Sequence, residues 1–224
     1  MAGAARRAGV ERFIHVSSGG VFGDGATAVP HAEGDPPKPG NAYERSKLAA
    51  EQAVSDALAS SSTSCAILRP AGIYGRGRPV TAAFFDEVRR RRLWLHATPN
   101  VIVHPTHVSD VVQACLRLLD RPEIGSAVLN VAGERALPFQ ELIAMTARAL
   151  GASARQVVVP AALGRPIARF ASSVLAAARL PVPTTLERVA RPYVNRALDT
   201  TLARTRLGFA PIPLDVGLRD SIDV

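Results

Sequence analysis

The chain has 224 residues, 47% of them hydrophobic and 21% charged, which suits one good-sized globular domain or a core with a smaller lobe and excludes a disordered chain. The net charge of +8 comes almost entirely from arginine, since Lys38 and Lys47 are the only lysines. The one basic cluster, Arg89–Arg92, has no interleaved aromatic residues, so we expect a solvated helix end there and no nucleic-acid partner.

The first part of the chain is predicted to run helix, strand, helix. Residues 2–8 favour the end of a helix, and this basic segment lacks the apolar run of a secretory signal. Phe13–Val16 is a continuous apolar run, typical of a strand that is buried on both faces of a parallel sheet. Residues 41–56 favour a helix that Asn41 caps, with Glu44 placed as in a capping box.

The middle of the chain continues this alternation. Ser64–Arg69 predicts a second buried strand, and the glycines of Gly72–Gly77 predict a loop. Residues 81–92 favour a helix and residues 93–96 a short strand. The next elements are a helix capped by Ser109 with Val111, Cys115, Leu118 and Leu119 on its buried face, a strand at Ala127–Val131, and a helix at Pro138–Leu150. Strands alternating with helices predict an α/β fold with a parallel sheet flanked by helices.

The last long helical pattern carries an apolar stripe. Its members are Ile167, Phe170, Ala171, Val174, Leu175 and Ala178. We expect this stripe to pack into the core, and we favour that interpretation over contact with a membrane surface. No apolar run reaches the roughly 18 residues that span a bilayer. Cys65 and Cys115 are expected to be buried reduced thiols, which favours a cytoplasmic location.

Tyr43 and Lys47 carry the clearest chemical signal. Their i, i+4 spacing places them on one face of the predicted helix. With three tyrosines and two lysines in the chain, such a pair arises by chance in roughly 3% of sequences. The helix follows a strand that runs into Ser17 and Ser18, and ligands of open α/β sheets bind at the carboxyl ends of strands. Because a nearby ammonium favours a phenolate, this constellation predicts a proton-transfer site.

Four more segments are similar to signatures of one family. They are Ser18-Gly-Gly-Val-Phe-Gly23, Leu68-Arg-Pro70-Ala-Gly-Ile-Tyr-Gly75, His107-Val-Ser-Asp110 and Leu207-Gly-Phe-Ala-Pro211. With the Tyr-x-x-x-Lys pair, they resemble the extended short-chain dehydrogenase/reductase family, in its NAD-dependent epimerase/dehydratase group, over nearly the whole chain.

The resemblance implies a site that uses NAD or NADP. Ser18 would polarise the substrate oxygen, Tyr43 would act as acid and base, and Lys47 would tune the tyrosine and orient the ribose. The implied cofactor-binding residues are Ser17, Tyr43, Lys47, Arg69, Pro70 and Gly72. The expected substrate-binding residues are Ser18, Gly19, Gly20, Arg76 and Tyr193.

The sequence departs from the family pattern in two places. It shows no Gly-x-x-Gly-x-x-Gly turn for the pyrophosphate, so we expect the chain to begin just before the fifth strand of the family's sheet. Gly19 and Gly20 stand where the family's dehydratases carry an Asp-Glu pair, which favours epimerisation or alcohol oxidoreduction over dehydration. The expected organisation is the C-terminal half of a Rossmann-type domain at residues 1–75 and 100–133, with a smaller substrate lobe at residues 76–99 and 134–224.

Three functions stay open at this point. The first is an epimerase or oxidoreductase of a nucleotide sugar, and the second is a reductase of a hydrophobic, steroid-like or flavonoid-like alcohol. The third is a non-catalytic remnant or partner subunit, and the assembly considered is a homodimer. A metal site built on His31, His96, His104 and His107 is not expected, because no carboxylate or cysteine joins them at ligand spacing.

Overall fold

The computed structural model describes residues 1–23, 29–90, 93–96, 101–181 and 196–222. Its centre is a parallel sheet with the strand order β1-β2-β7. The strands are β1 (Arg12–Val16), β2 (Ser64–Pro70) and β7 (Ala127–Val131), and Val16 pairs with Leu68 while Leu68 pairs with Leu129. The predicted α/β fold with a parallel sheet is therefore confirmed.

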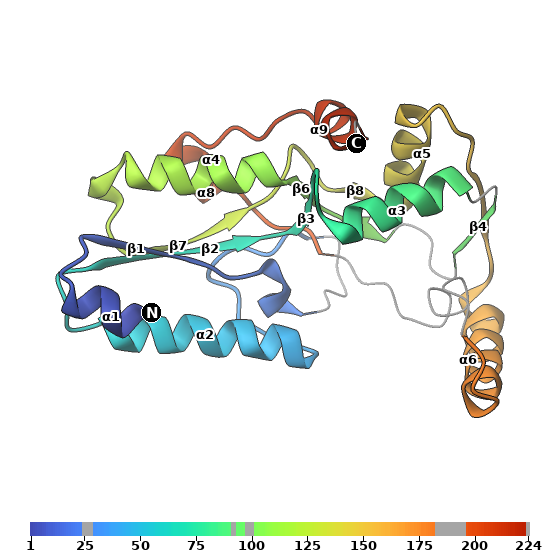
Figure 1. The fold of residues 1–224 in the computed structure, drawn as a ribbon, viewed down its shortest axis with the longest axis horizontal. Helices are drawn as coiled ribbons and strands as arrows, with labels where there is room; N and C mark the ends of the chain where they lie inside the picture. Colours follow the sequence, from blue (N-terminus) through green and yellow to red (C-terminus); the bar gives the residue numbers. More distant parts are fainter. Residues whose placement is uncertain (24–28, 91–92, 97–100, 182–195, 223–224) are drawn as a thin grey trace.

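Helices cover both faces of this sheet (Figure 1). One face carries α1 (Ala2–Arg7) and α2 (Ala42–Leu58), and the other carries α4 (Val108–Leu119) and α8 (Thr201–Leu207). The main core forms between the sheet and the second pair of helices. It contains Ala66, Leu68, Leu129 and Val131 from the strands, Val111, Ala114 and Leu118 from α4, and Ala203 and Leu207 from α8.

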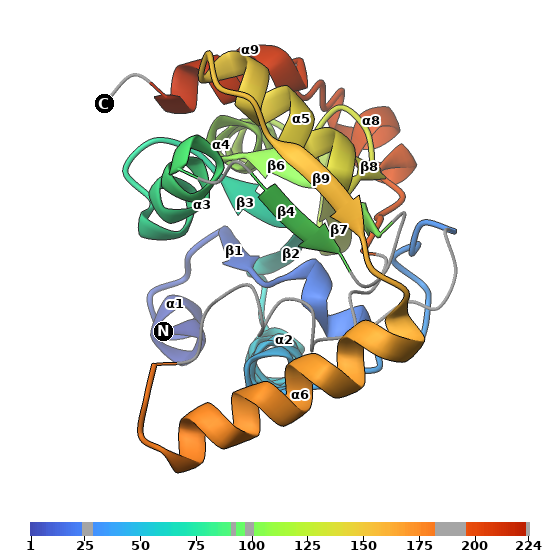
Figure 2. The same cartoon turned by 90° about the vertical axis from the view of Figure 1, so that its right-hand side faces the viewer.

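The rest of the described chain forms smaller sheets and their helices (Figure 2). The strand pairs are β3 (Gly72–Tyr74) with β6 (Pro105–His107), β4 (Leu93–His96) with β9 (Arg155–Val158), and β5 (Ile102–Val103) with β8 (Leu137–Pro138). The helices are α3 (Pro79–Arg90), α5 (Phe139–Ala149), α6 (Ala161–Ala177) and α9 (Leu214–Ile222), with short 3-10 turns η1 (Gly19–Phe22) and η2 (Pro122–Ile124). The division into two domains stays a prediction.

Two predictions about strands are wrong. The β1 strand is only half-buried and its last residue, Val16, is exposed. Within the described ranges β1 pairs with β2 alone, so it lies at the edge of the sheet and is not enclosed as a central strand is. The predicted loop at residues 72–77 begins with the strand β3, because Gly72, Ile73 and Tyr74 pair in register with β6.

The start of α4 also differs from the prediction. Its cap is His107, whose ring nitrogen accepts a hydrogen bond from the Ser109 backbone N–H, while Asp110 accepts from the His107 backbone N–H. Ser109 therefore lies inside the first turn and does not cap the helix. Leu119, predicted on the buried face, is exposed, and Ala114 takes its place in the core.

The apolar stripe at residues 167–178 is the largest departure from prediction. It lies on the longer helix α6, and its large side chains Ile167, Phe170 and Val174 are exposed. Both views show α6 at the periphery of the molecule (Figures 1 and 2). The prediction that this stripe packs into the core is wrong. Among the described residues, no helix has the length and apolar character to cross a bilayer.

Candidate active site

The site begins where β1 ends. Ser17 follows β1 directly, and its backbone N–H donates to Leu68 O at 2.8 Å, which extends the pairing with β2. The Ser17 side chain is buried, and its Oγ has no hydrogen-bond partner among the described residues. Ser18 has an extended backbone, and its Oγ accepts a hydrogen bond from Gly20 N at 3.0 Å. Because Ser18 Oγ accepts from the backbone, its hydroxyl proton stays available for donation to another oxygen.

Gly19 and Gly20 pack closely against the protein. A Cβ on Gly19 would lie 2.7 Å from Leu198 Cδ1, and a Cβ on Gly20 would lie 3.2 Å from Glu44 Cγ. Gly19 therefore has no room for a larger side chain unless Leu198 moves. The packing around Gly19 and Gly20 therefore leaves little room for the Asp-Glu pair that the dehydratases of the family carry there.

Buried polar contacts hold the start of α2. Asn41 Oδ1 accepts from Glu44 N at 3.0 Å, which confirms the predicted cap. The Glu44 carboxylate does not return to Asn41 N–H as in a capping box; it accepts from Gly40 N at 2.8 Å and pairs with Arg196 at 2.8 Å. Glu44 is buried, so these contacts compensate a charge that has been removed from water.

Lys47 joins α2 to the end of β1. Its Nζ donates to Val16 O at 3.2 Å and lies 5.9 Å from the centre of the Tyr43 ring. Tyr43 itself is exposed, on the same side of α2 as Lys47. The structure therefore brings the predicted pair to the strand end that carries Ser17 and Ser18.

Arg69 lies beneath this region and is almost fully buried. Its guanidinium donates to both carboxylate oxygens of Glu51 on α2, at 3.0 Å from Nε and 2.7 Å from Nη2, and to Glu33 O at 3.1 Å. It also stacks 5.0 Å from the ring centre of Phe22 in η1. The side chain thus fixes α2 and η1 relative to β2.

The remaining predicted residues fall in different places. Pro70 is the last residue of β2, the strand beside β1, and Gly72 follows shortly after it as the first residue of β3. Arg76 is exposed and donates to Asp220 O at 3.2 and 3.3 Å, on α9. Tyr193 lies outside the described residues. The structure therefore places the Arg76 side chain against the helix α9 and does not describe Tyr193.

The histidines considered as metal ligands have other partners. His31 stacks on Phe22 and contacts Asp35. His104 is buried; its Nε2 hydrogen-bonds to Gly133 O, and its Nδ1 accepts a hydrogen bond from the Leu198 backbone N–H. His107 caps α4, and nothing is described for the side chain of His96. In the described ranges no group of three or more metal-ligating side chains comes together.

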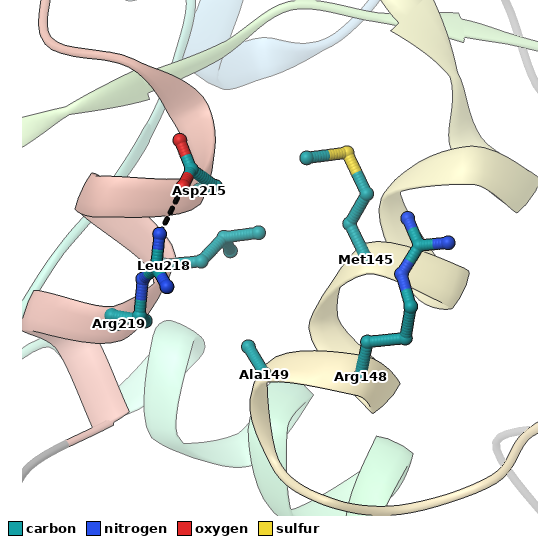
Figure 3. A pocket seen from close by; sticks show the side chains of 6 residues that line it. All are labelled: Met145, Arg148, Ala149, Asp215, Leu218 and Arg219. Carbon is teal, nitrogen blue, oxygen red and sulfur yellow. Dashed lines mark hydrogen bonds and ion pairs between the residues drawn. The ribbon is translucent and has the colours of Figure 1, made fainter.

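Two pockets have linings that do not include the residues Val16, Ser17 and Ser18 at the end of β1. A pocket of about 240 Å³ between α5 and α9 is lined by Met145, Arg148, Ala149, Asp215, Leu218 and Arg219, with Arg219 paired to Asp215 (Figure 3). A mostly apolar cavity of about 300 Å³ includes Gly72, Ile73 and Tyr74 together with Phe84, Phe85 and Phe139. Burial, and then the charge of Asp110, raise the pKa of Tyr74, so this hydroxyl stays protonated. Only the second pocket includes a residue predicted for the cofactor, Gly72.

Sequence reasoning missed the buried acids of α2. Glu44, Leu48 and Glu51 share one face of the helix, and both acids are buried there. A helical projection would have shown two carboxylates on the inward stripe, a position that requires a cationic partner. The partners, Arg69 and Arg196, come from distant parts of the chain and carry no local signal.

Comparisons with known proteins identify the family and the fold of the chain. The profile described as "NAD dependent epimerase/dehydratase family" matches residues 1–132. The 3beta-hydroxysteroid-dehydrogenase/decarboxylase isoform 1 of Arabidopsis thaliana is 27% identical over 233 residues, covering 96% of this chain and 53% of that protein. The dTDP-4-dehydrorhamnose reductase of Mycobacterium tuberculosis is 38% identical over 130 residues, covering 55% of this chain and 40% of that protein.

A solved structure resembles the whole chain. MoeE5, determined in complex with UDP-glucuronic acid and NAD, superposes with a TM-score of 0.73 at 27% identity and covers 99% of this chain and 67% of its own. This chain spans about half the length of the curated relatives that it matches.

Proposed function

The chain belongs to the NAD dependent epimerase/dehydratase family, and on that premise we propose that it transfers hydride between a nicotinamide cofactor and a nucleotide sugar, interconverting a secondary alcohol and a ketone of the sugar. Epimerisation and simple oxidoreduction share this step. The observation that carries the proposal is the contact of Lys47 Nζ with Val16 O, which places Lys47 and Tyr43 at the strand end beside Ser17 and Ser18.

The residues at this strand end fit the nicotinamide side of NAD or NADP. The ribose carries hydroxyl groups, and Lys47 offers an ammonium that is half-exposed at the same edge. Ser17 Oγ is buried and has no partner in the described part of the chain, as expected of a group whose partner is a ligand. Pro70 and Gly72, at the neighbouring strand end, are proposed to line the ring. When bound, the cofactor supplies or accepts the hydride.

Tyr43 is the proposed proton carrier. Its side chain is exposed, and the Lys47 ammonium lies 5.9 Å from the centre of its ring. In the alcohol-oxidising direction, Tyr43 accepts the proton of the substrate hydroxyl as the carbon loses hydride. Ser18 donates its hydroxyl proton in a hydrogen bond to the same oxygen, because its own oxygen already accepts from Gly20 N. Arg69 is a positioning residue in this proposal, since it holds α2 through Glu51.

A second substrate class has an observation of its own. The apolar cavity of about 300 Å³ beside Gly72 is lined by Ile73, Phe84, Phe85 and Phe139, which suits a hydrophobic alcohol better than a charged sugar diphosphate. The printed name of the Arabidopsis relative, a 3beta-hydroxysteroid-dehydrogenase/decarboxylase, points to the same class. Nucleotide sugars remain the first proposal because MoeE5 and the mycobacterial reductase act on or bind such compounds by their printed names.

The test compares Tyr43→Phe with the wild type in the full-length protein. Hydride transfer is followed by nicotinamide absorbance against a panel of nucleotide sugars and hydrophobic alcohols. We expect Tyr43→Phe to lower kcat by about 10²- to 10⁴-fold with cofactor affinity retained, since the ring stays in place. Gln52→Ala is the matched control, because Gln52 is exposed on the same helix and its side chain donates to Asp56 on that helix.

Two results would contradict the proposal. Unchanged turnover in Tyr43→Phe would remove the tyrosine from the chemistry. A failure of this chain to bind NAD or NADP by calorimetry at micromolar concentration, with the fold intact by circular dichroism, would favour the non-catalytic or partner-subunit alternative for the chain on its own.

A further inference from the structure

We infer that α6 docks on an anionic lipid surface through an exposed apolar stripe formed by Leu163, Ile167, Phe170 and Val174. These side chains follow the spacing i, i+4, i+7, i+11 and therefore share one face of the helix. They are between 51% and 74% exposed, which is unusual for four large apolar residues in a row along one helix.

Other residues of α6 form a separate, less accessible line along the helix. Gly164 and Ala168 are buried, and Leu175 is half-buried along the same line of the helix. The stripe lies on another side of the helix and stays in solvent. The stripe is therefore not a core face that happens to be partly open; it is a second face of the same helix.

The positive charge of residues 152–180 favours an anionic partner. From residue 152 to residue 180 the chain contains no aspartate or glutamate, but it contains Arg155, Arg165, Arg169 and Arg179. Arg169 and Arg179 are exposed, and Arg165 is half-buried. A helix with large apolar side chains on one face and only arginine among its charged residues matches the composition of helices that lie in the interface of anionic membranes.

A second copy of this chain fits the stripe less well. A symmetric pair through α6 would bring two arginine-bearing helices together without an acidic residue on either helix to pair with them. Like charges opposed across an interface are unfavourable. An anionic headgroup layer would attract the exposed Arg179, and the acyl boundary would take up the apolar side chains.

Exposed apolar residues also flank α6 in the sequence. Val157 and Val158 of β9 and Leu180 after α6 are also exposed, so the apolar exposure continues on both sides of the helix in sequence. Within the described ranges no helix can span a bilayer, so docking of this kind would be contact from one side.

The experiment is sedimentation with extruded vesicles, using the complete chain. Vesicles of phosphatidylcholine and phosphatidylserine in about a 3:1 ratio are compared with vesicles of phosphatidylcholine alone. We expect binding to the anionic vesicles that falls with added salt. Reversal of one charge in Arg179→Glu should weaken binding by at least about fivefold, since one basic residue near such a surface contributes about that factor.

The apolar face is tested by Ile167→Ser with Phe170→Ser. This double variant should lose about tenfold or more in vesicle affinity, because two large side chains no longer insert. The matched control is Leu116→Ser with Leu119→Ser on α4, which removes two apolar side chains of 55% and 58% exposure outside α6 and should leave binding unchanged.

A single added fluorophore checks insertion without weakening the face. Trp94, the one tryptophan of the chain, is fully buried, so its emission should not respond to lipid. Phe170→Trp should therefore give a blue shift on addition of anionic vesicles.

Three outcomes would overturn the inference. They are the absence of binding to anionic vesicles, an equal loss in the α4 control, or a concentration-dependent dimer that Ile167→Ser with Phe170→Ser dissociates while vesicle binding persists. None of these readouts depends on catalysis, so the inference and the proposed function can fail separately.

Discussion

Removal of the Glu51 carboxylate should destabilise the fold far more than the loss of one hydrogen bond. Glu51 and Arg69 are 5% and 6% exposed, and Arg69 donates to both carboxylate oxygens at 2.7 to 3.3 Å. In Glu51→Ala the guanidinium stays buried, with only Glu33 O and the Phe22 ring as its described neighbours. A buried charge that loses its partner costs about 3–5 kcal/mol. We expect a loss of that size in the free energy of unfolding.

The assay is urea unfolding followed by circular dichroism, with the free energy extrapolated to water. The control is the double variant Glu51→Leu with Arg69→Met, which removes both charges and retains similar volume. This pair should recover most of the loss, because replacing both partners with apolar side chains is often close to neutral. A Glu51→Ala variant within about 1 kcal/mol of wild type, or a double variant as unstable as the single one, would refute the reasoning.

Three further predictions concern stability. Burial lowers the pKa of His104 to about 4 from an ordinary value of 6.5, so between these pH values the unfolded chain binds a proton that the folded chain does not. The free energy of unfolding should therefore fall by up to about 3 kcal/mol as the pH drops from 6.5 to 4. In urea unfolding measured at several pH values, His104→Gln should flatten this dependence. Gly133→Ala should lower the melting temperature measured by calorimetry, since its Cβ would lie 2.1 Å from Pro105 O, a clash that a shift of the backbone must relieve at a cost of about 1–3 kcal/mol. Asn41→Ala should cost about 1 kcal/mol in urea unfolding through loss of the α2 cap, whereas Asn41→Asp, which keeps the acceptor, should not.

The local features of the site were predictable, and the long-range ones were not. Tyr43, Lys47 and the serines after β1 lie in one strand–helix unit, so spacing and the carboxyl-end rule locate them without a structure. The partners of Arg69 were not predictable, because Glu51 and Glu33 reach it only after the sheet and α2 have packed. Sequence pattern reports which residues share a face, but not what that face meets.

The wrong predictions about the fold also concern long-range contacts. The α6 stripe has the periodicity of a core helix, but periodicity does not distinguish a core face from a face that points into solvent. The glycines of residues 72–77 predict a loop where the short strand β3 forms, because its pairing with β6 depends on residues about 30 positions away. The β1 strand was expected to be enclosed because its apolar run is that of a central strand, whereas the described sheet places it at an edge.

The near absence of lysine gives the Lys47 contact a practical use. Amine-selective reagents can modify only Lys38, Lys47 and the terminal amine of this sequence, so each modified peptide is assigned without ambiguity. Lys38 is exposed, whereas Lys47 is half-buried with its ammonium bonded to Val16 O. Only an uncharged, detached amine reacts, so the labelling rate of Lys47 relative to Lys38 records how often the Lys47 amine leaves Val16 O. Lys38 serves as the internal reference in the same sample, and a ligand that covers the strand end would register as protection of one amine and not the other.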